Sequence, residues 1–151
     1  MSLPFDDPIL KNHVDRLLQS YLLWTGRELL PPGPDHCRTL FFQPFVVLSH
    51  GIQDDPLLNY GNQAALDLWE MTWEEFTNTP SRLTAEPVNR IDRDRLLEQV
   101  RQNGYIDTYR GVRISRSGRR FLIEKGTVWN IIDEKKEYAG QAATFSRWTY
   151  L

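Results

Sequence analysis

Cysteine is nearly absent from this chain of 151 residues, in which Cys37 is the only example. One thiol excludes a disulfide within the chain, and it excludes metal sites built from several thiolates. Histidine is also scarce, and His13, His36 and His50 lie far apart in the sequence. We interpret the His36-Cys37 pair as part of an exposed linker, so the sequence predicts no metal site.

The sequence also lacks a long apolar run. Its apolar stretches, such as Phe45 to Leu48, are far shorter than the about 20 residues that span a membrane. The first residues are acidic and contain no basic segment followed by an apolar one, which a signal peptide requires. We therefore expect no membrane span and a cytoplasmic protein.

Neither sign of charge dominates the composition. The 18 Lys and Arg residues nearly balance the 20 Asp and Glu residues, and the net charge is −2. This balance argues against a protein that binds nucleic acid over a broad face. One local basic cluster consists of Arg110, Arg113, Arg116, Arg119, Arg120 and Lys125. The cluster fits an anion or acidic-partner site or, as we favour, a solvated sheet edge whose charges discourage pairing with other strands.

Apolar residues make up 40% of the chain and aromatic residues 12%, which is enough for the core of one domain. Near the N-terminus, Val14, Leu17 and Tyr21 recur at spacings of three and four and predict an amphipathic helix. An aspartate at position 6 or 7 can cap its start, with a proline in the first turn. Gly26 is expected to end or kink it.

A Pro-Pro-Gly-Pro segment at 31–34 breaks the chain after this helix. We therefore divide the sequence into a helical extension with a Pro-rich linker over 1–35 and a main domain over 36–151. The apolar stripe of the helix has two possible uses, packing on the sheet of its own chain or meeting its copy in a second chain. We favour a homodimer formed through this helix and the sheet.

Strands and grouped helices follow in the main domain. Asn62 and Thr72 are predicted helix caps, and Thr72 with Glu75 fits a capping box. In the helix over 89–102 we expect Ile91, Leu96, Leu97 and Val100 to face inward. The predicted elements are strands over 41–49 and 57–60, helices over 62–69, 72–76 and 89–102, and strands over 105–115, 119–132 and 138–150. Strands separated by a block of helices indicate an α+β fold with an antiparallel sheet.

Several motifs in this order resemble PAS-type sensor domains. They are Tyr60-Gly61-Asn62, Trp73-Glu74-Glu75-Phe76, Gly104-Tyr105 and Ser117-Gly118-Arg119-Arg120-Phe121. Longer strings are similar to one PAS-related family, the MEKHLA domain proteins of the stand-alone bacterial type. These strings include Pro44 to Gly51, Asn59 to Gln63, Ala85 to Arg90, Gly111 to Ser115 and Gly140 to Phe145. The resemblance implies a five-stranded antiparallel sheet with helices packed on one face, plus the N-terminal helix.

A PAS fold often encloses a ligand between its sheet and its helices, so the resemblance implies a possible pocket. The candidate pocket residues are Phe45, Val47, Trp69, Phe76, Arg82, Asn89, Arg113, Phe121, Ile123, Val128, Ala143 and Phe145. Flavin photosensors of this superfamily carry a reactive Cys where this chain has Ser81, and haem-binding relatives carry a His on the long helix, where this chain has none. The resemblance therefore favours neither flavin nor haem, and we expect no cofactor.

The family is usually described as a sensory or interaction module. Our first hypothesis is a non-enzymatic module that binds a small ligand, a protein partner or both. A second is a small enzyme with an acid or base in the cavity, for which Glu70, Glu86, Glu124 and His50 are the candidates. A third is a purely structural dimerisation module with a filled core. We do not favour a Ser49-His50 catalytic pair, because adjacent strand residues point to opposite faces.

Overall fold

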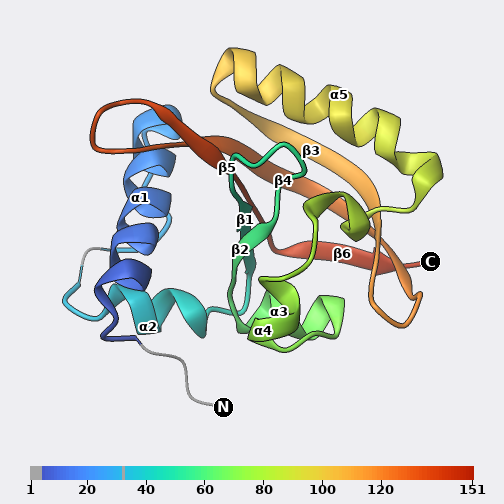
Figure 1. Cartoon of the computed structure of the whole chain (residues 1–151), viewed down its shortest axis with the longest axis horizontal. Helices are drawn as coiled ribbons and strands as arrows, with labels where there is room; N and C mark the ends of the chain where they lie inside the picture. Colours follow the sequence, from blue (N-terminus) through green and yellow to red (C-terminus); the bar gives the residue numbers. More distant parts are fainter. Residues whose placement is uncertain (1–4, 32) are drawn as a thin grey trace.

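The computed structural model describes residues 5–31 and 33–151, so Pro32 of the predicted break lies outside the described part. An antiparallel sheet dominates the fold, with the strand order β2-β1-β5-β4-β3 (Figure 1). The strands are β1 (Val46–His50), β2 (Leu58–Gly61), β3 (Tyr105–Ile114), β4 (Arg120–Ile132), β5 (Tyr138–Phe145) and β6 (Arg147–Tyr150). The predicted α+β fold is confirmed, with β6 as a sixth strand paired with β4.

The helices begin where local capping chemistry predicts. The side chain of Asp7 accepts a hydrogen bond from the backbone of Ile9, Asn62 caps α3, and Thr72 forms a complete capping box with Glu75. The helices are α1 (Pro8–Thr25), α2 (His36–Phe41), α3 (Gln63–Trp69), α4 (Trp73–Phe76), the 3-10 helix η1 (Ser81–Thr84) and α5 (Pro87–Asn103). Within the described residues, no helix is both long and apolar enough to cross a membrane.

Two apolar clusters cover the two faces of the sheet. Val46 and Val128 pack in the cluster that lies under α3, α4 and α5. Their chain neighbours Val47 and Trp129 point to the opposite face, where they pack with Leu17 of α1. In Figure 1, α1 and α5 accordingly lie on opposite sides of the sheet. The stripe of α1 is therefore used within the chain, the first of its two predicted uses.

The segment before β1 differs from the prediction. His36 and Cys37 begin the short helix α2 instead of an exposed linker, and Cys37 is buried. Phe41 ends this helix and packs its ring against Phe5 at 5.5 Å, so the strand starts only at Val46. Aromatic residues suit both elements, and here the contact with a distant residue decides in favour of the helix.

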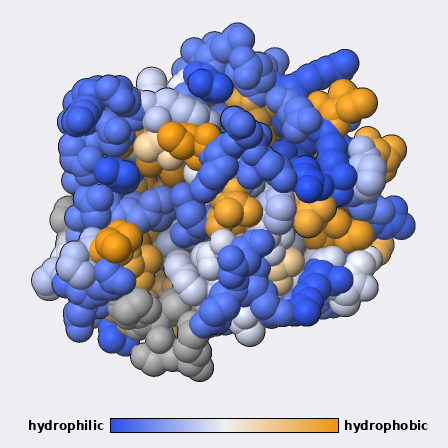
Figure 2. Space-filling model, in the orientation of Figure 1, coloured by the Kyte–Doolittle hydropathy of each residue, from blue (hydrophilic) through white to orange (hydrophobic). Residues whose placement is uncertain are grey.

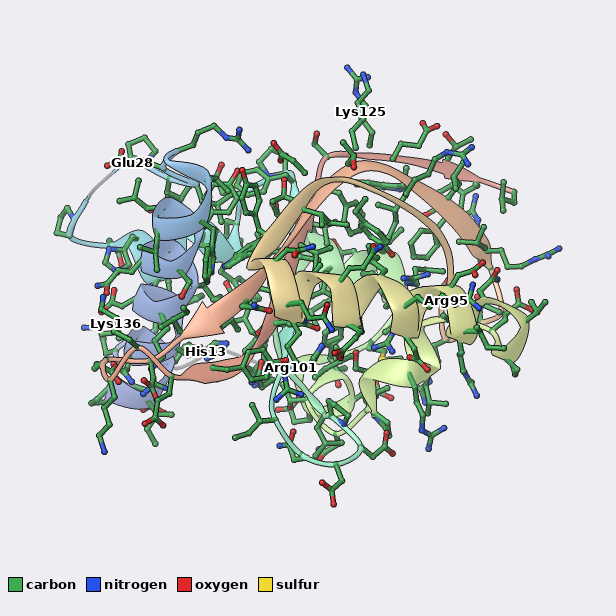
Figure 3. The ribbon with its side chains drawn as sticks, turned by 90° about the horizontal axis from the view of Figure 1, so that it is seen from above. His13, Glu28, Arg95, Arg101, Lys125 and Lys136 are labelled. Atoms are coloured by element: carbon green, nitrogen blue, oxygen red, sulfur yellow. The ribbon has the colours of Figure 1, made fainter. Side chains whose placement is uncertain are left out.

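The predicted closing strand over 138–150 is interrupted at Ser146. The first part, β5, pairs with the end of β4, and the second part, β6, pairs with its beginning. β4 bends at the same level, where Lys125 adopts a positive φ of 53°. Figure 3 shows Lys125 pointing away from the body of the protein at this bend. The break at Ser146, which lies level with the bend of β4, divides the predicted closing strand into the two short strands β5 and β6.

Helix α5 presents a different face to the sheet from the one we predicted. Ile91 is 66% exposed, whereas Arg93 is only 8% exposed. Val100 is buried, and Leu96 and Leu97 are partly buried, as expected. Leu96 and Leu97 follow Arg93 by three and four positions, and Val100 follows them by four and three. The inward stripe of α5 therefore begins with an arginine. Its long aliphatic stem packs like an apolar residue, while its head reaches a polar partner.

Candidate functional site

A small cavity lies between the sheet and the helices on the α5 side. Its volume is about 60 Å³, and β1, β4, β5, α3, η1 and α5 all contribute to its wall. Most of the lining is apolar, with leucine, isoleucine, valine, alanine and phenylalanine side chains. The polar and aromatic members are Ser49, His50, Trp69, Ser81, Thr84, Arg93, Tyr109, Arg113 and Gln141. An apolar wall into which polar groups project is the usual lining of a ligand site, although this cavity is much smaller than most such sites.

Half of the predicted pocket residues line this cavity. They are Trp69, Arg113, Ile123, Val128, Ala143 and Phe145. They come from four elements that are distant in the sequence, so the topology of the sheet brings them together. Whether they bind a ligand stays a prediction.

Two predicted pocket residues lie on the other side of the sheet. Val47 points toward α1, and Phe45, just before β1, packs in the same cluster. Positions two apart on a strand share a face, and the strand residues Val46 and Leu48 pack on the α5 side instead. Phe45 and Val47 were therefore correctly placed on one face, but that face packs against α1 and not against the cavity.

Four further candidates lie near the cavity without lining it. Phe76 and Phe121 fill the core beside Trp69, with ring centroids 6.2 Å and 5.2 Å from its ring. Arg82 is on the surface, where its Nε lies 3.2 Å from the carboxylate of Asp55. Asn89 lines only an outer groove between α5 and β3. The remaining site is thus smaller than the sequence suggested.

Arg93 and Arg113 are the buried charges of the site. Nη2 of Arg93 donates to the hydroxyl of Ser81, and its Nη1 donates to the carboxylate of Asp94 at 3.2 Å. Nη1 of Arg113 donates to the carbonyl oxygen of Val112 at 2.7 Å. Burial, and then the charge of Arg113, lower the pKa of Arg93. Two guanidinium groups therefore share one poorly hydrated region.

His50 and Trp69 add two polar atoms that have no hydrogen-bond partner among the described residues. Nδ1 of His50 lies 3.0 Å from the carbonyl oxygen of Gly51, and a carbonyl can only accept, so Nδ1 carries the proton. Nε2 of His50 is then a buried acceptor without a partner, and Nε1–H of Trp69 is a buried donor without one. Burial lowers the pKa of His50 and favours this neutral form. Buried polar atoms left unpaired are rare, and a molecule in the cavity would satisfy them.

Gln141 connects the cavity to the end of α5. Its Nε2 donates to the carbonyl oxygen of Leu97 at 2.8 Å and to Oδ1 of Asn130 at 3.2 Å. Asn130 in turn donates to the last carbonyl oxygens of α5, those of Val100 and Arg101. The C-terminal end of α5 is therefore fixed to the sheet by a buried amide pair.

Ser49 and His50 point to opposite faces, as the strand geometry predicts. The hydroxyl of Ser49 donates to Oδ1 of Asn59, and its oxygen lies 2.9 Å from Nε2 of His13 on α1. Since the Ser49 proton is directed to Asn59, Nε2 of His13 must donate to the serine oxygen. A histidine that donates here cannot act as a base toward Ser49. This Ser–His contact therefore fixes α1 to the sheet and does not form a nucleophile; Figure 3 labels His13 beside the sheet.

This contact makes stability depend on pH. Burial, helped by the charge of Arg16, lowers the pKa of His13 from 6.5 to about 4. Between these values the unfolded chain binds more protons than the folded chain, so the free energy of unfolding rises with pH. We expect a gain of about 3 kcal/mol across this window, measured by urea unfolding at a series of pH values.

His13→Gln keeps a neutral donor and is expected to remove most of that pH dependence. His50 titrates in the same direction, but it is present in both proteins and cancels in the difference between their curves. Parallel curves for the two proteins would contradict the assignment to His13.

The three carboxylates proposed for acid–base chemistry lie outside the cavity. Glu70 is exposed and accepts a hydrogen bond from the backbone of Ser117 at 3.0 Å. Glu86 and Glu124 lie near Arg120 and Arg110, at 3.7 Å and 3.9 Å. Only His50 of the four candidates lines the cavity. Among the described residues, no group of three His, Cys, Asp or Glu side chains is arranged to hold a metal ion.

The basic cluster does not form one continuous face. Arg113 is buried in the site, and Arg110, Arg116 and Arg120 each approach a glutamate. Arg119 stacks over the ring of Tyr150 at 3.4 Å. Most of the cluster is therefore a paired surface, and Arg113 is its one buried member.

Comparison with known proteins gives relatives that are far longer than this chain. ATHB-9, a homeobox-leucine zipper protein of Arabidopsis thaliana, is 23% identical over 143 residues, and ATHB-8 of the same plant is 24% identical over 135 residues. The alignments cover 89% and 87% of this chain but 17% and 16% of the two relatives. The chain thus spans less than a fifth of the length of either plant protein.

Solved structures with low sequence identity share the fold. A PAS domain of a protein from Colwellia psychrerythraea has a TM-score of 0.63 at 13% identity and covers 77% of this chain and 93% of its own. The light-state dimer of the fungal blue-light photoreceptor Vivid has a TM-score of 0.61 at 15% identity and covers 95% and 97%. The sequence profile of the MEKHLA domain matches residues 11–150. Since this match extends over nearly the whole chain, the protein belongs to the MEKHLA domain family, which is PAS-related.

Proposed function

We propose that this PAS-like sensory module binds a small molecule in the cavity between the sheet and α3, η1 and α5. The observation that carries the proposal is the combination of a partly enclosed space with unsatisfied buried polar atoms on His50 and Trp69. Among the described residues, Tyr60 and Trp129 in the cluster on the α1 side also carry unpaired buried atoms. His50 and Trp69 differ from them in lining an open space, which a purely structural core would fill. The binding of a ligand would then change the packing of α5, which forms one wall of the cavity.

A flavin or a haem does not fit this site. Some solved neighbours are light-oxygen-voltage proteins, one of them studied with a flavin analogue. Sites for molecules of that size have volumes of about 300 Å³ or more, whereas this cavity has about 60 Å³. Ser81 also stands where the resemblance places a reactive cysteine. We therefore propose a ligand of only a few heavy atoms.

We propose that the site is not catalytic. His50 is the only one of the four acid–base candidates at the cavity, and its Nδ1–H is held by the carbonyl oxygen of Gly51. Acid–base chemistry on a bound molecule usually needs a second group of matched pKa. The arginines next to His50 favour binding and orientation rather than proton transfer.

A second copy of the chain is the protein partner we propose, in a cytoplasmic setting. Because the stripe of α1 is buried on its own sheet, such a dimer would use the outward side of α1, where Ile9 and Leu23 are exposed. The face seen in Figure 2 is mostly hydrophilic, and its hydrophobic residues form several separate groups. The paired arginines described above give no support to nucleic-acid binding over a broad face.

Filling the cavity distinguishes a ligand site from a filled core. We expect Ala143→Leu to raise the free energy of unfolding of the ligand-free protein by about 1 kcal/mol, because the added methyl groups occupy empty space. It should also abolish the small molecule that mass spectrometry finds after denaturing protein purified from cells. A loss of about 1–3 kcal/mol together with no released molecule from the wild type would show an overpacked structural core and contradict the proposal.

A further inference from the structure

The buried positive charge of the site lacks a matching buried negative charge. Arg93 pairs with Asp94, but the side chain of Asp94 is 71% exposed and faces water. Arg113 has no ion pair among the described residues: its guanidinium donates to the backbone carbonyl oxygen of Val112 and lies over the ring of Tyr109, 5.3 Å from its centroid. Each guanidinium has five N–H donors, and the hydrogen bonds named here use only some of them. A buried charge without a partner costs free energy, which a bound anion would recover.

The apolar part of the cavity wall determines the chemistry of the other end of the ligand. Leu96 of α5, Val128 of β4 and Ala143 of β5 face this space with apolar groups. A volume of about 60 Å³ holds roughly four water molecules, or one organic molecule of similar size. The matching molecule has one anionic end and a short apolar body.

The two arginines also lie on the path into the site. Both line an outer groove between α5 and β3 as well as the inner cavity, so they separate the two spaces. The groove has a volume of about 480 Å³ and is lined by Arg95 and Arg110 too, against a single carboxylate, that of Asp92. Figure 3 shows Arg95 on α5. Arg93 pairs with Asp94, and Arg110 lies 3.9 Å from Glu124. Arg95 and Arg113 against Asp92 then leave a small positive charge, which favours anions at the entrance.

We propose that the cavity binds a short-chain organic carboxylate, with its carboxylate between Arg93 and Arg113 and its chain against the apolar wall. The inference rests on the proposed function and names the ligand class of that same site. A guanidinium group can bind a carboxylate through two parallel hydrogen bonds, which are among the strongest in proteins. Trp69 also lines the cavity, and its Nε1–H is a further buried donor. Enclosure limits the chain to a few carbon atoms.

The test compares butyrate with butyramide, its neutral analogue of equal shape, by calorimetric titration of the full chain. We expect butyrate to bind about 10- to 100-fold more tightly, since hydrogen bonds to a charged group are the stronger ones. Arg113→Met should reduce butyrate affinity by a similar factor while leaving the ligand-free protein at least as stable, because it removes an unpaired buried charge. The matched control Arg82→Met changes a surface arginine and should leave butyrate affinity unchanged.

The outcomes separate this inference from the proposed function. Equal affinities for butyramide and butyrate would overturn the proposal of a carboxylate ligand, while the proposal of a small-molecule site would stand. Phosphate or chloride binding as tightly as butyrate, and competing with it, would replace the organic ligand by an inorganic anion and overturn the proposal. No binding of any probe, with no molecule released from the purified protein, would overturn both. The comparison of the two probes needs only the wild-type chain, so it remains decisive if a variant fails to fold.

Discussion

Asn62→Ala is expected to lower the free energy of unfolding by about 4 kcal/mol, because the side chain of Asn62 holds three segments together. It is fully buried. Its Oδ1 accepts from the backbone nitrogens of Val47 and Ala65 at 3.0 Å and 3.2 Å. Its Nδ2 donates to the carbonyl oxygens of Leu40 and Phe45 at 3.3 Å and 2.8 Å. Alanine removes all four of these hydrogen bonds, although the carbonyl oxygen of Leu40 still accepts from the backbone nitrogen of Gln43, and urea unfolding measures the loss.

Asn62→Asp distinguishes this network from a simple helix cap. Aspartate caps a helix as well as asparagine does, so a pure capping role predicts almost no change. In the network, however, a carboxylate faces two carbonyl oxygens that have lost their donors, and we expect a loss at least as large as that of alanine. Gln63→Ala, at the exposed next position, should change stability by less than about 0.5 kcal/mol. If the Asn62→Asp variant were as stable as the wild type, Asn62 would act only as a helix cap.

Asn62 also shows what could be predicted from the sequence. A capping residue acts on the next few backbone groups, so the sequence alone predicts Asn62, Thr72 and one of Asp6 and Asp7 as caps. The structure confirms Asn62 and Thr72 and shows Asp7 as the third cap. The bonds from Asn62 to Leu40 and Phe45 depend on segments that meet only in the folded chain. Helix α2 and the interruption of the closing strand were missed for the same reason, because neither has a local signal that outweighs its tertiary contacts.

The candidate site shows the same difference between residues that the sequence predicts and residues that only the folded chain reveals. Ile123 and Val128 were predicted as apolar positions of a long strand, but they are five positions apart, and strict alternation would place them on opposite faces. Both line the cavity because β4 is irregular between them, where Lys125 has a positive φ and the register with β3 shifts. Arg93 was missed because an arginine on a charged helix is normally solvated, whereas here its head donates to the hydroxyl of Ser81, 12 residues away, and to the carboxylate of Asp94. The signal that could have located it is the spacing of three and four that Arg93 shares with Leu96, Leu97 and Val100. His50 was not among the predicted pocket residues, although the alternation of β1 places it opposite Ser49 and therefore on the cavity side.

Gly140→Ala is the second change for which we expect a large effect, a loss of at least about 3 kcal/mol in the free energy of unfolding. Gly140 has a φ of +135°, a conformation that L side chains rarely adopt. A Cβ there would lie 2.2 Å from the backbone oxygen of His50 on the neighbouring strand β1. Backbone cannot rotate away as a side chain can, so β1 and β5 would have to separate where His50 pairs with Gln141.

Gly118→Ala is the matched control, because Gly118 also has a positive φ, of +92°, but a Cβ there meets nothing within 4 Å. We expect it to cost about 1 kcal/mol, the conformational penalty alone. The difference between the two variants then measures the clash with β1. Since His50 and Gln141 both line the cavity, the clash should weaken ligand binding in Gly140→Ala and leave it intact in Gly118→Ala. Equal losses of stability with unchanged binding in both would mean that β1 yields without cost, and that the pairing of β1 with β5 does not hold the cavity in shape.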